Sequence, residues 1–140
     1  MVTREELIAG MNEDLAAELG TIIRYTYQAS KSFGPLGIEL RELFAEETVD
    51  ELGHAAYLSD MIVDLGGEPT TAPKSFEKPE SMKEMLELDV KHELQDVHAY
   101  MKHAEMAGEL GEVDIAMKLE EMAADEAGHA RELRRILKGL

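Results

Sequence analysis

Hydrophobic residues recur in alternating steps of three and four along four long segments of this chain, and charged residues fill most of the positions between them. This spacing places the apolar side chains on one face of an α-helix, as in helices that pack together in a bundle. Clusters of glycine and proline separate the segments. The predicted helices cover about 4–32, 37–65, 82–108 and 112–138.

The ends of these segments indicate how they are connected. Thr3 with Glu6, and Ser81 with Glu84, have the spacing of a capping box at a helix N-terminus. Short turns join the first helix to the second and the third to the fourth, so each pair forms an antiparallel hairpin. The proline-containing linker 67–80, when extended, reaches about 46 Å and can therefore run the length of a helix of about 43 Å.

These features predict an all-α fold with a single domain over residues 1–140. Two antiparallel hairpins joined by the long crossover form a four-helix bundle in which the second and third helices are parallel. No segment has the roughly 20 apolar residues of a transmembrane helix, and the N-terminus lacks the apolar run of a signal peptide. We therefore expect a cytoplasmic protein with no membrane partner.

Glutamates interrupt the apolar face of each predicted helix near its middle. Each of these four glutamates is the same number of residues from the centre of the turn in its own hairpin, so all four fall at one level of the bundle. They are Glu18, Glu51, Glu93 and Glu126. His54 and His129 lie one turn after the second and fourth of these, on the same faces. Because desolvating a charge is costly, carboxylates enter a core only when they are paired or bind metal.

The two halves of the chain repeat this pattern at an offset of 75 residues, the separation of Glu51 and Glu126. In both halves a glutamate on one helix is followed 33 residues later by a Glu-x-x-His motif on the next, as Glu18 is by Glu51. The repeat predicts a site with approximate twofold symmetry. A single Glu-x-x-His motif would be weak evidence in so glutamate-rich a chain, and the symmetric placement makes the prediction specific.

Composition narrows the chemistry of such a site. Lysine and arginine number 14 against 30 acidic residues, a net charge of −16, which argues against a nucleic-acid partner. The absence of cysteine excludes disulfides, thiolate zinc sites, iron-sulfur clusters and cysteine nucleophiles. Four carboxylates would balance two divalent cations, and oxygen-rich ligation with one nitrogen per ion suits iron or manganese, with zinc able to bind in vitro.

With these residues the sequence resembles the ferritin-like superfamily, most of all bacterioferritin and the diiron domain of rubrerythrin. The family's six metal ligands fall on Glu18, Glu51, His54, Glu93, Glu126 and His129. The resemblance implies two iron ions bridged by Glu51 and Glu126. It further implies that Glu18 and His54 complete the ligands of one ion, and Glu93 and His129 those of the other. It also implies oxidation of ferrous iron by oxygen or hydrogen peroxide in a homo-oligomer, a dimer or larger, with storage of the ferric product in cage-forming members.

Three departures from the family pattern qualify this resemblance. Leu52 stands where bacterioferritins place a haem-ligating methionine, so no haem is expected there. Bacterioferritin subunits have a short fifth helix that helps close the cage, whereas this chain ends at Leu140, just past the fourth predicted helix, so the sequence leaves open whether a closed cage forms. Rubrerythrins have an added glutamate near the third-helix ligand and usually a cysteine-bearing domain, whereas this chain has Asp96 and no cysteine.

Two further pairs of residues are candidates for a supporting role. Asp50 and Asp125 directly precede the Glu-x-x-His motifs and can accept a hydrogen bond from the ligand histidine of the opposite motif. A solvated helix face is an equally good interpretation of this pair. Tyr25 and Tyr100 lie two turns after the first glutamate of their half, so their hydroxyls are expected to bond the site carboxylates or to supply an electron, with core packing as the alternative.

The remaining polar positions carry weaker expectations. Glu47 shares the face of Glu51 and is a candidate for metal access or a third metal, but its repeat partner is Met122, which favours a structural interpretation. Three histidines lie off the apolar faces and are expected at the surface: His92, His98 and His103.

The sequence thus predicts a ferroxidase-type oxidoreductase with bacterioferritin-like iron handling. A rubrerythrin-like peroxide reductase, which needs an electron donor, is the alternative enzyme. A noncatalytic metal-stabilised bundle or assembly subunit is the alternative of another class, and it predicts metal binding without redox turnover. A DNA-protecting relative is disfavoured by the acidic charge.

Overall fold

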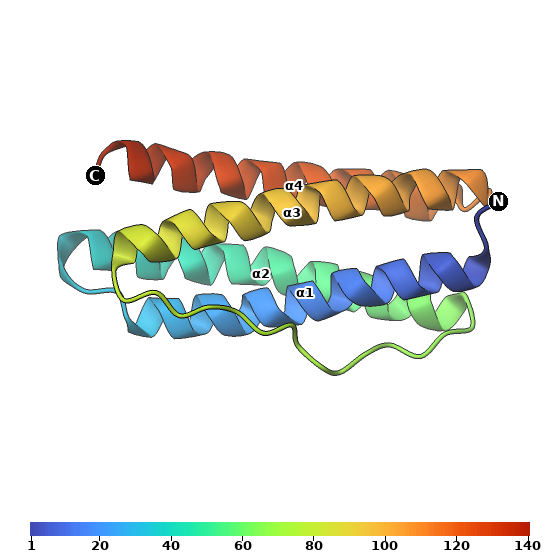
Figure 1. Cartoon of the computed structure of the whole chain (residues 1–140), viewed down its shortest axis with the longest axis horizontal. Coiled ribbons are helices and arrows are strands. Elements are labelled where there is room, and N and C mark those ends of the chain that lie inside the picture. Colours follow the sequence, from blue (N-terminus) through green and yellow to red (C-terminus); the bar gives the residue numbers. More distant parts are fainter.

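The computed structural model describes all residues, Met1–Leu140, and contains four α-helices (Figure 1). They are α1 (Arg4–Ser30), α2 (Gly34–Asp64), α3 (Met82–Glu109) and α4 (Val113–Lys138). Short turns make α1–α2 and α3–α4 antiparallel hairpins, and the segment 65–81 runs back along the bundle, so α2 and α3 are parallel. The predicted fold class is confirmed. None of the four helices combines the length and the apolar character of a membrane span.

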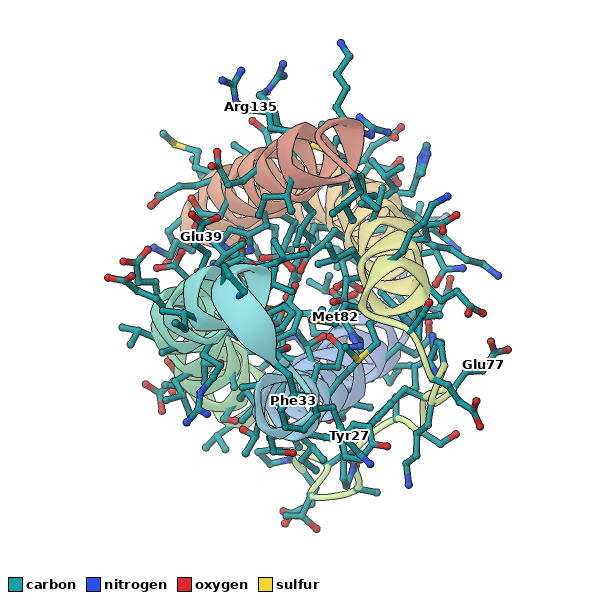
Figure 2. All side chains as sticks on the ribbon, turned by 90° about the vertical axis from the view of Figure 1, so that its left-hand side faces the viewer. Tyr27, Phe33, Glu39, Glu77, Met82 and Arg135 are labelled. Carbon is teal, nitrogen blue, oxygen red and sulfur yellow. The ribbon has the colours of Figure 1, made fainter.

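Seen from its end, the bundle has one helix at each of four corners (Figure 2). Besides the contacts within each hairpin, α1 packs against α3 and α2 packs against α4. The diagonal pairs, α1 with α4 and α2 with α3, make no close backbone contact. Each helix therefore turns one face toward a shared axis, which is where side chains from all four can meet.

The helix ends follow the local sequence. Thr3 and Ser81 cap α1 and α3 as predicted, because their hydroxyl oxygens accept hydrogen bonds of 3.1 Å from the N–H groups three residues later. α2 begins at Gly34, three residues before the predicted start. Gly34 has a φ of 73°, which glycine adopts without strain, and Pro35 then occupies the first turn, where its missing N–H costs nothing.

The crossover is fixed along α1 by a few specific contacts. The side chain of Asn12 donates to the carbonyl of Glu68 at 3.0 Å and accepts from the N–H of Thr70 at 2.8 Å. Further along, the N–H of Lys74 donates to the carbonyl of Ala16 at 2.9 Å. Gly20 makes room for this approach, since a Cβ there would lie 2.5 Å from the Lys74 carbonyl oxygen.

The apolar core is divided into two parts along the bundle. The larger part includes Leu7, Met11 and Leu15 of α1 together with buried residues of the other three helices. The smaller part consists of Tyr25, Leu40, Phe44, Leu86 and Leu133, with the rings of Tyr25 and Phe44 stacked at 5.0 Å between centroids. Between the two parts, at the level of residue 18 in α1, the interior is polar.

Candidate metal centre

The polar layer brings together all six residues that the sequence singled out. Each helix contributes one glutamate, and the side chains of Glu18, Glu51, Glu93 and Glu126 are fully buried, with 0% of their surface exposed. His54 on α2 and His129 on α4 are also buried, one turn after the glutamates of their helices. The equal spacing of the glutamates from the two hairpin turns explains why they meet at one level.

The two histidines turn the same ring nitrogen, Nδ1, toward the shared carboxylates. The Nδ1 atom of His54 lies 3.8 Å from Glu51 Oε1 and 3.5 Å from Glu126 Oε1. The Nδ1 atom of His129 lies 3.4 Å from each of the same two oxygens. Glu51 and Glu126 therefore stand between the histidines. Glu18 lies near His54, at 3.6 Å, and Glu93 lies near His129, at 3.7 Å.

The opposite ring nitrogen of each histidine contacts an aspartate on the facing helix. His54 Nε2 lies 2.9 Å from Asp125 Oδ2, and His129 Nε2 lies 2.9 Å from Asp50 Oδ2. These are the reciprocal contacts considered in the sequence analysis. When Nε2 carries a proton and donates it to the aspartate, the lone pair of Nδ1 points into the centre, which is the orientation that a metal ligand needs.

Tyrosine hydroxyls support the two outer glutamates. Tyr100 on α3 donates to Glu18 on α1, and Tyr25 on α1 donates to Glu93 on α3. Both rings are buried, so each hydroxyl finds its partner inside the bundle. The sequence analysis placed the tyrosines near the site carboxylates, and the structure pairs each with the glutamate of the opposite half.

The donor atoms fit a pair of metal ions. Both carboxylate oxygens of Glu51 and Glu126, and Nδ1 of both histidines, are buried without a hydrogen-bond partner. Native proteins seldom leave so many buried polar atoms unpaired unless something else binds them. Ligand bonds of about 2.0–2.2 Å around one ion separate neighbouring donors by about 3–4 Å, and the distances from Nδ1 to the carboxylates match this separation.

The protonation of the metal-free site reflects its burial. Burial raises the pKa of Glu51 and of Glu126 well above the ordinary carboxyl value, and the neighbouring carboxylates raise it further. Burial acts on Glu93 in the same direction, but the nearby imidazole of His129, together with the hydroxyl of Tyr25, outweighs it and lowers the pKa of Glu93. Burial lowers the pKa of His129, but the carboxylate of Glu93 outweighs this and raises it to about 9. Without metal, the centre therefore retains protons that a cation would displace.

Two additional carboxylates lie close to the Glu93 side of the centre. Glu47 is buried and can offer an oxygen within 4.8 Å of donors from Glu93 and His129. Asp96 is half-buried and forms a similar group with Glu93 and Glu126. Burial raises the pKa of Glu47 to about 8 and that of Asp96 well above its ordinary value. The repeat gives neither residue a carboxylate counterpart, so the twofold symmetry of the centre is only approximate.

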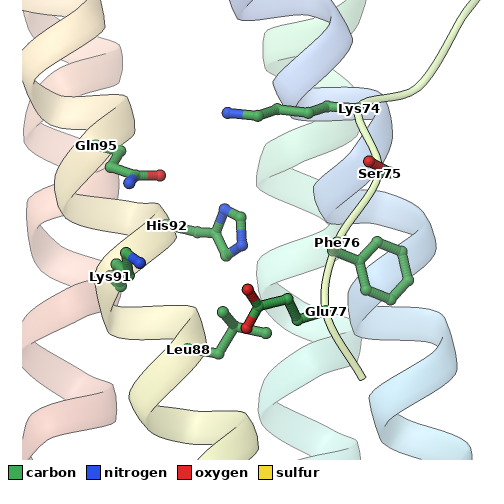
Figure 3. A pocket seen from close by; sticks show the side chains of 8 residues that line it. All are labelled: Lys74, Ser75, Phe76, Glu77, Leu88, Lys91, His92 and Gln95. Carbon is green, nitrogen blue, oxygen red and sulfur yellow. The ribbon is translucent and has the colours of Figure 1, made fainter. Parts of the chain in front are cut away.

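The prediction that His103 lies at the protein surface is wrong. This side chain is 3% exposed, and its Nδ1 lies 2.6 Å from Asp14 Oδ2, because α1 and α3 approach closely at this level. His98 is exposed as predicted. His92 is half-buried and points into a hollow of about 390 Å³ between α3 and the crossover, which Lys74 also lines (Figure 3).

Sequence reasoning also missed a buried ion pair beside the centre. The guanidinium of Arg24 donates to Asp89 at 2.8 Å, and both side chains are almost fully buried. One signal was available, since Asp14 and Asp89 are equivalent in the repeat and each precedes a buried glutamate by one turn. Their partners, His103 and Arg24, carry no comparable signal.

Comparison with known proteins agrees with this geometry. The ferritin-like domain model matches residues 8–140. Bacterioferritin from Brucella melitensis is 30% identical over 129 residues, which cover 89% of this chain and 78% of the relative. A ferritin-like diiron-carboxylate protein from Bacillus anthracis superposes with a TM-score of 0.93 at 42% identity, over 96% of each chain.

A second solved structure is that of bacterioferritin from Desulfovibrio desulfuricans, which shows its diiron site in different catalytic states. It superposes with a TM-score of 0.82 at 25% identity, over 96% of this chain and 80% of that one. The family model covers nearly the whole chain, and the Brucella relative is matched over most of its own length. This chain therefore belongs to the ferritin-like family.

Proposed function

We propose that this protein binds two iron ions at the centre of the bundle and oxidises ferrous iron with oxygen or hydrogen peroxide. The observation that carries the proposal is the set of buried donor atoms on Glu51, Glu126, His54 and His129, which converge on one space and have no partner within the protein. Membership of the ferritin-like family and the diiron sites named for its relatives support iron as the metal.

The ligands divide between two metal positions. Glu18 and His54 would hold one ion, Glu93 and His129 the other, and Glu51 with Glu126 would bridge them. The assignment rests on the nearly equal distances from both Nδ1 atoms to the bridging oxygens. Carboxylates with a single imidazole per ion suit iron and manganese, and zinc can occupy the same donors in vitro.

Two ferrous ions held side by side supply two electrons, which is the number needed to reduce oxygen to peroxide or peroxide to water. The surrounding side chains keep the donors in place for this chemistry. Asp50 and Asp125 fix the rings of the histidines, and the hydroxyls of Tyr25 and Tyr100 hold the outer glutamates by one oxygen each. The buried tyrosines are also close enough to the carboxylates to serve as electron donors.

Ferrous iron, as substrate, would approach the centre between α2 and α4. A hollow of about 450 Å³ opens there, and the buried His129 is one of the residues that line it. Its acidic lining includes Glu46, Glu47, Asp50 and Glu132. A net charge of −16 draws cations to the protein, and an acidic funnel concentrates them at one opening. We therefore place the route of ferrous iron past Glu47.

The outer face of α2 supports assembly into a homo-oligomer. Ile38, Val49, Leu52 and Val63 are more than half exposed along this helix, so a second copy of the chain would remove apolar surface from water. Leu52 has no donor atom for a haem iron, and we expect no haem at this position.

The proposed function is tested by adding ferrous iron in increasing amounts to metal-free protein in air. Ferric absorbance gives the oxidation rate, and size fractionation locates the iron. Oxidation well beyond two irons per chain, with iron retained in a large particle, indicates storage. A halt near two irons on a small oligomer indicates an enzyme that uses peroxide and an electron donor. Binding without oxidation indicates a noncatalytic metal-stabilised bundle and refutes the proposal.

Variants connect the outcome to the proposed ligands. Glu51→Ala combined with Glu126→Ala removes both bridges and should abolish tight binding of two metals per chain. The matched control is Glu42→Ala combined with Glu120→Ala, which changes exposed glutamates on the same two helices. Two tightly bound metals in the bridge variant would show that the site lies elsewhere.

A further inference from the structure

Asp14 and His103 form a buried polar pair that holding two metal ions does not require. Their side chains are 4% and 3% exposed, and His103 Nδ1 lies 2.6 Å from Asp14 Oδ2. Asp14 precedes Glu18 by one turn on α1, and His103 follows Tyr100 by one turn on α3. Since Tyr100 donates to Glu18, the pair lies directly beyond the Glu18 end of the metal centre.

α1 is shaped to receive the imidazole of His103. Gly10 faces the ring, and a Cβ at this position would lie 2.6 Å from both Cδ2 and Nε2 of His103. Any larger residue would push the ring away from Asp14. The protein provides Nδ1 with its aspartate and gives Nε2 no hydrogen-bond partner. One nitrogen thus contacts a carboxylate, and the other has no hydrogen-bond partner within the protein.

The other half of the repeat lacks a comparable pair. The 75-residue offset places Asp89 at the position of Asp14 and Gln28 at the position of His103. Asp89 is instead paired with Arg24 at 2.8 Å. A guanidinium keeps its proton at any working pH, whereas an imidazole has two ring nitrogens and can accept a proton on one and release a proton from the other. Of the two aspartates that are equivalent in the repeat, only Asp14 is therefore paired with a side chain able to pass a proton on.

The proposed oxidation, on which this inference rests, produces protons at a buried site. Two ferrous ions, one dioxygen and four waters give two ferric oxyhydroxide units, one hydrogen peroxide and four protons. With hydrogen peroxide as oxidant, two ferrous ions and two waters give two ferric oxyhydroxide units and again four protons. The glutamates at the centre are fully buried, so these protons need a route to solvent.

We propose that Asp14 and His103 form this route, carrying protons from the Glu18 end of the metal centre to solvent. Asp14 and Glu18 are one helical turn apart, so their Cβ atoms are about 5–6 Å from each other, and one water can bridge their carboxylates. Asp14 receives the proton and passes it to Nδ1 of His103. The imidazolium then releases the proton on Nε2, so the number of protons on the pair is unchanged after each transfer.

The electrostatic surroundings of Asp14 suit this role. Burial raises the pKa of Asp14 to about 6, although hydrogen bonding to His103 opposes the rise and Glu18 adds to it. A group that titrates near the working pH can both accept and release a proton readily. The charged or titratable neighbours of the pair are Glu13 and Glu18 on α1, and Asp96 and Tyr100 on α3.

The test replaces His103 by the residue that the chain uses in its other half. In His103→Gln the amide can still bond Asp14 but cannot relay a proton. Stopped-flow absorbance follows ferric formation, and a pH indicator follows proton release. Both should slow by about tenfold or more, with a larger solvent deuterium isotope effect. Anaerobic binding of two Co²⁺ per chain should be unchanged. The control, His98→Gln, changes an exposed histidine of the same helix and should match wild type.

A second variant separates proton transfer from packing. His103→Ala leaves a space beside Gly10, and imidazole added to the buffer should restore a substantial part of its oxidation rate. Wild-type rates and isotope effects in His103→Gln would overturn the inference. Slow variants that imidazole does not rescue and that show no larger isotope effect would also overturn it, because they indicate a packing role. A wild-type protein that binds metal without oxidising ferrous iron would instead refute the proposed function itself.

Discussion

The four buried glutamates imply that the metal-free protein is less stable than it would be without its proposed metal ligands. Replacing one bridge by its neutral isostere, Glu126→Gln, removes a carboxyl group that is 0% exposed and surrounded by three others. The amide keeps the shape of the side chain and can donate to the neighbouring carboxylates. We therefore expect Glu126→Gln to stabilise the metal-free protein while it weakens metal binding.

The spacing of the charges gives the magnitude. Donor atoms of Glu126 and Glu18 lie within 4.8 Å of each other, and two like charges at that distance repel by about 3.5 kcal/mol at an effective dielectric constant of about 20. Burial and the neighbouring carboxylates raise the pKa of Glu126 well above its ordinary value, so removing this ionisable group should stabilise the folded metal-free protein. We expect a gain of about 2–3 kcal/mol, or about 6–10 °C in Tm.

The assay is urea and thermal unfolding, followed by circular dichroism, of wild type and Glu126→Gln after treatment with a chelator. The gain should be present at pH 7 and should disappear below pH 4.5, where the wild-type carboxyl is protonated in both folded and unfolded chains. Added metal should reverse the order, because a ligand at a thousand times its Kd stabilises wild type by about 4 kcal/mol. A metal-free variant less stable than wild type at pH 7 would refute the reasoning.

Three other changes test separate parts of the structure. Burial raises the pKa of Glu47 from 4.5 to about 8, so between these pH values the folded metal-free protein binds a proton that the unfolded chain has lost. The free energy of unfolding, measured in urea, should therefore fall as the pH rises from 4.5 to about 8. A free energy of unfolding that rises over this range would contradict the prediction. Arg24→Met leaves Asp89 buried without a cation and should cost about 3–5 kcal/mol in urea unfolding, most of it recovered when Asp89→Leu is added. Gly20→Ala puts a Cβ against the crossover and should cost about 1–3 kcal/mol, whereas Gly53→Ala, which has open space, should be neutral or stabilising.

Much of the centre could be predicted because it follows helical spacing and the repeat. Glu51 and Glu126 interrupt apolar faces at equivalent positions, and short turns fix the level at which they meet. His103 was misplaced because it lies off the apolar face of its helix, and only the close approach of α1 and α3 buries it. The path of the crossover depends on contacts such as that of Lys74 with Ala16, which join residues remote in sequence and follow no local pattern.

The crossed contacts of the histidines with Asp50 and Asp125 have a consequence for motion. α2 and α4 share the least extensive of the lateral helix interfaces, and these two hydrogen bonds, with the ligands around them, span it. Few close backbone contacts oppose a local separation of the two helices at this interface. Bound metal would join the two helices at mid-length and oppose this separation. The fraction of chains with bound metal therefore determines how often α2 and α4 separate locally. The rate of amide hydrogen exchange along α2 and α4 should therefore fall as metal binds, and it reports how much metal is bound.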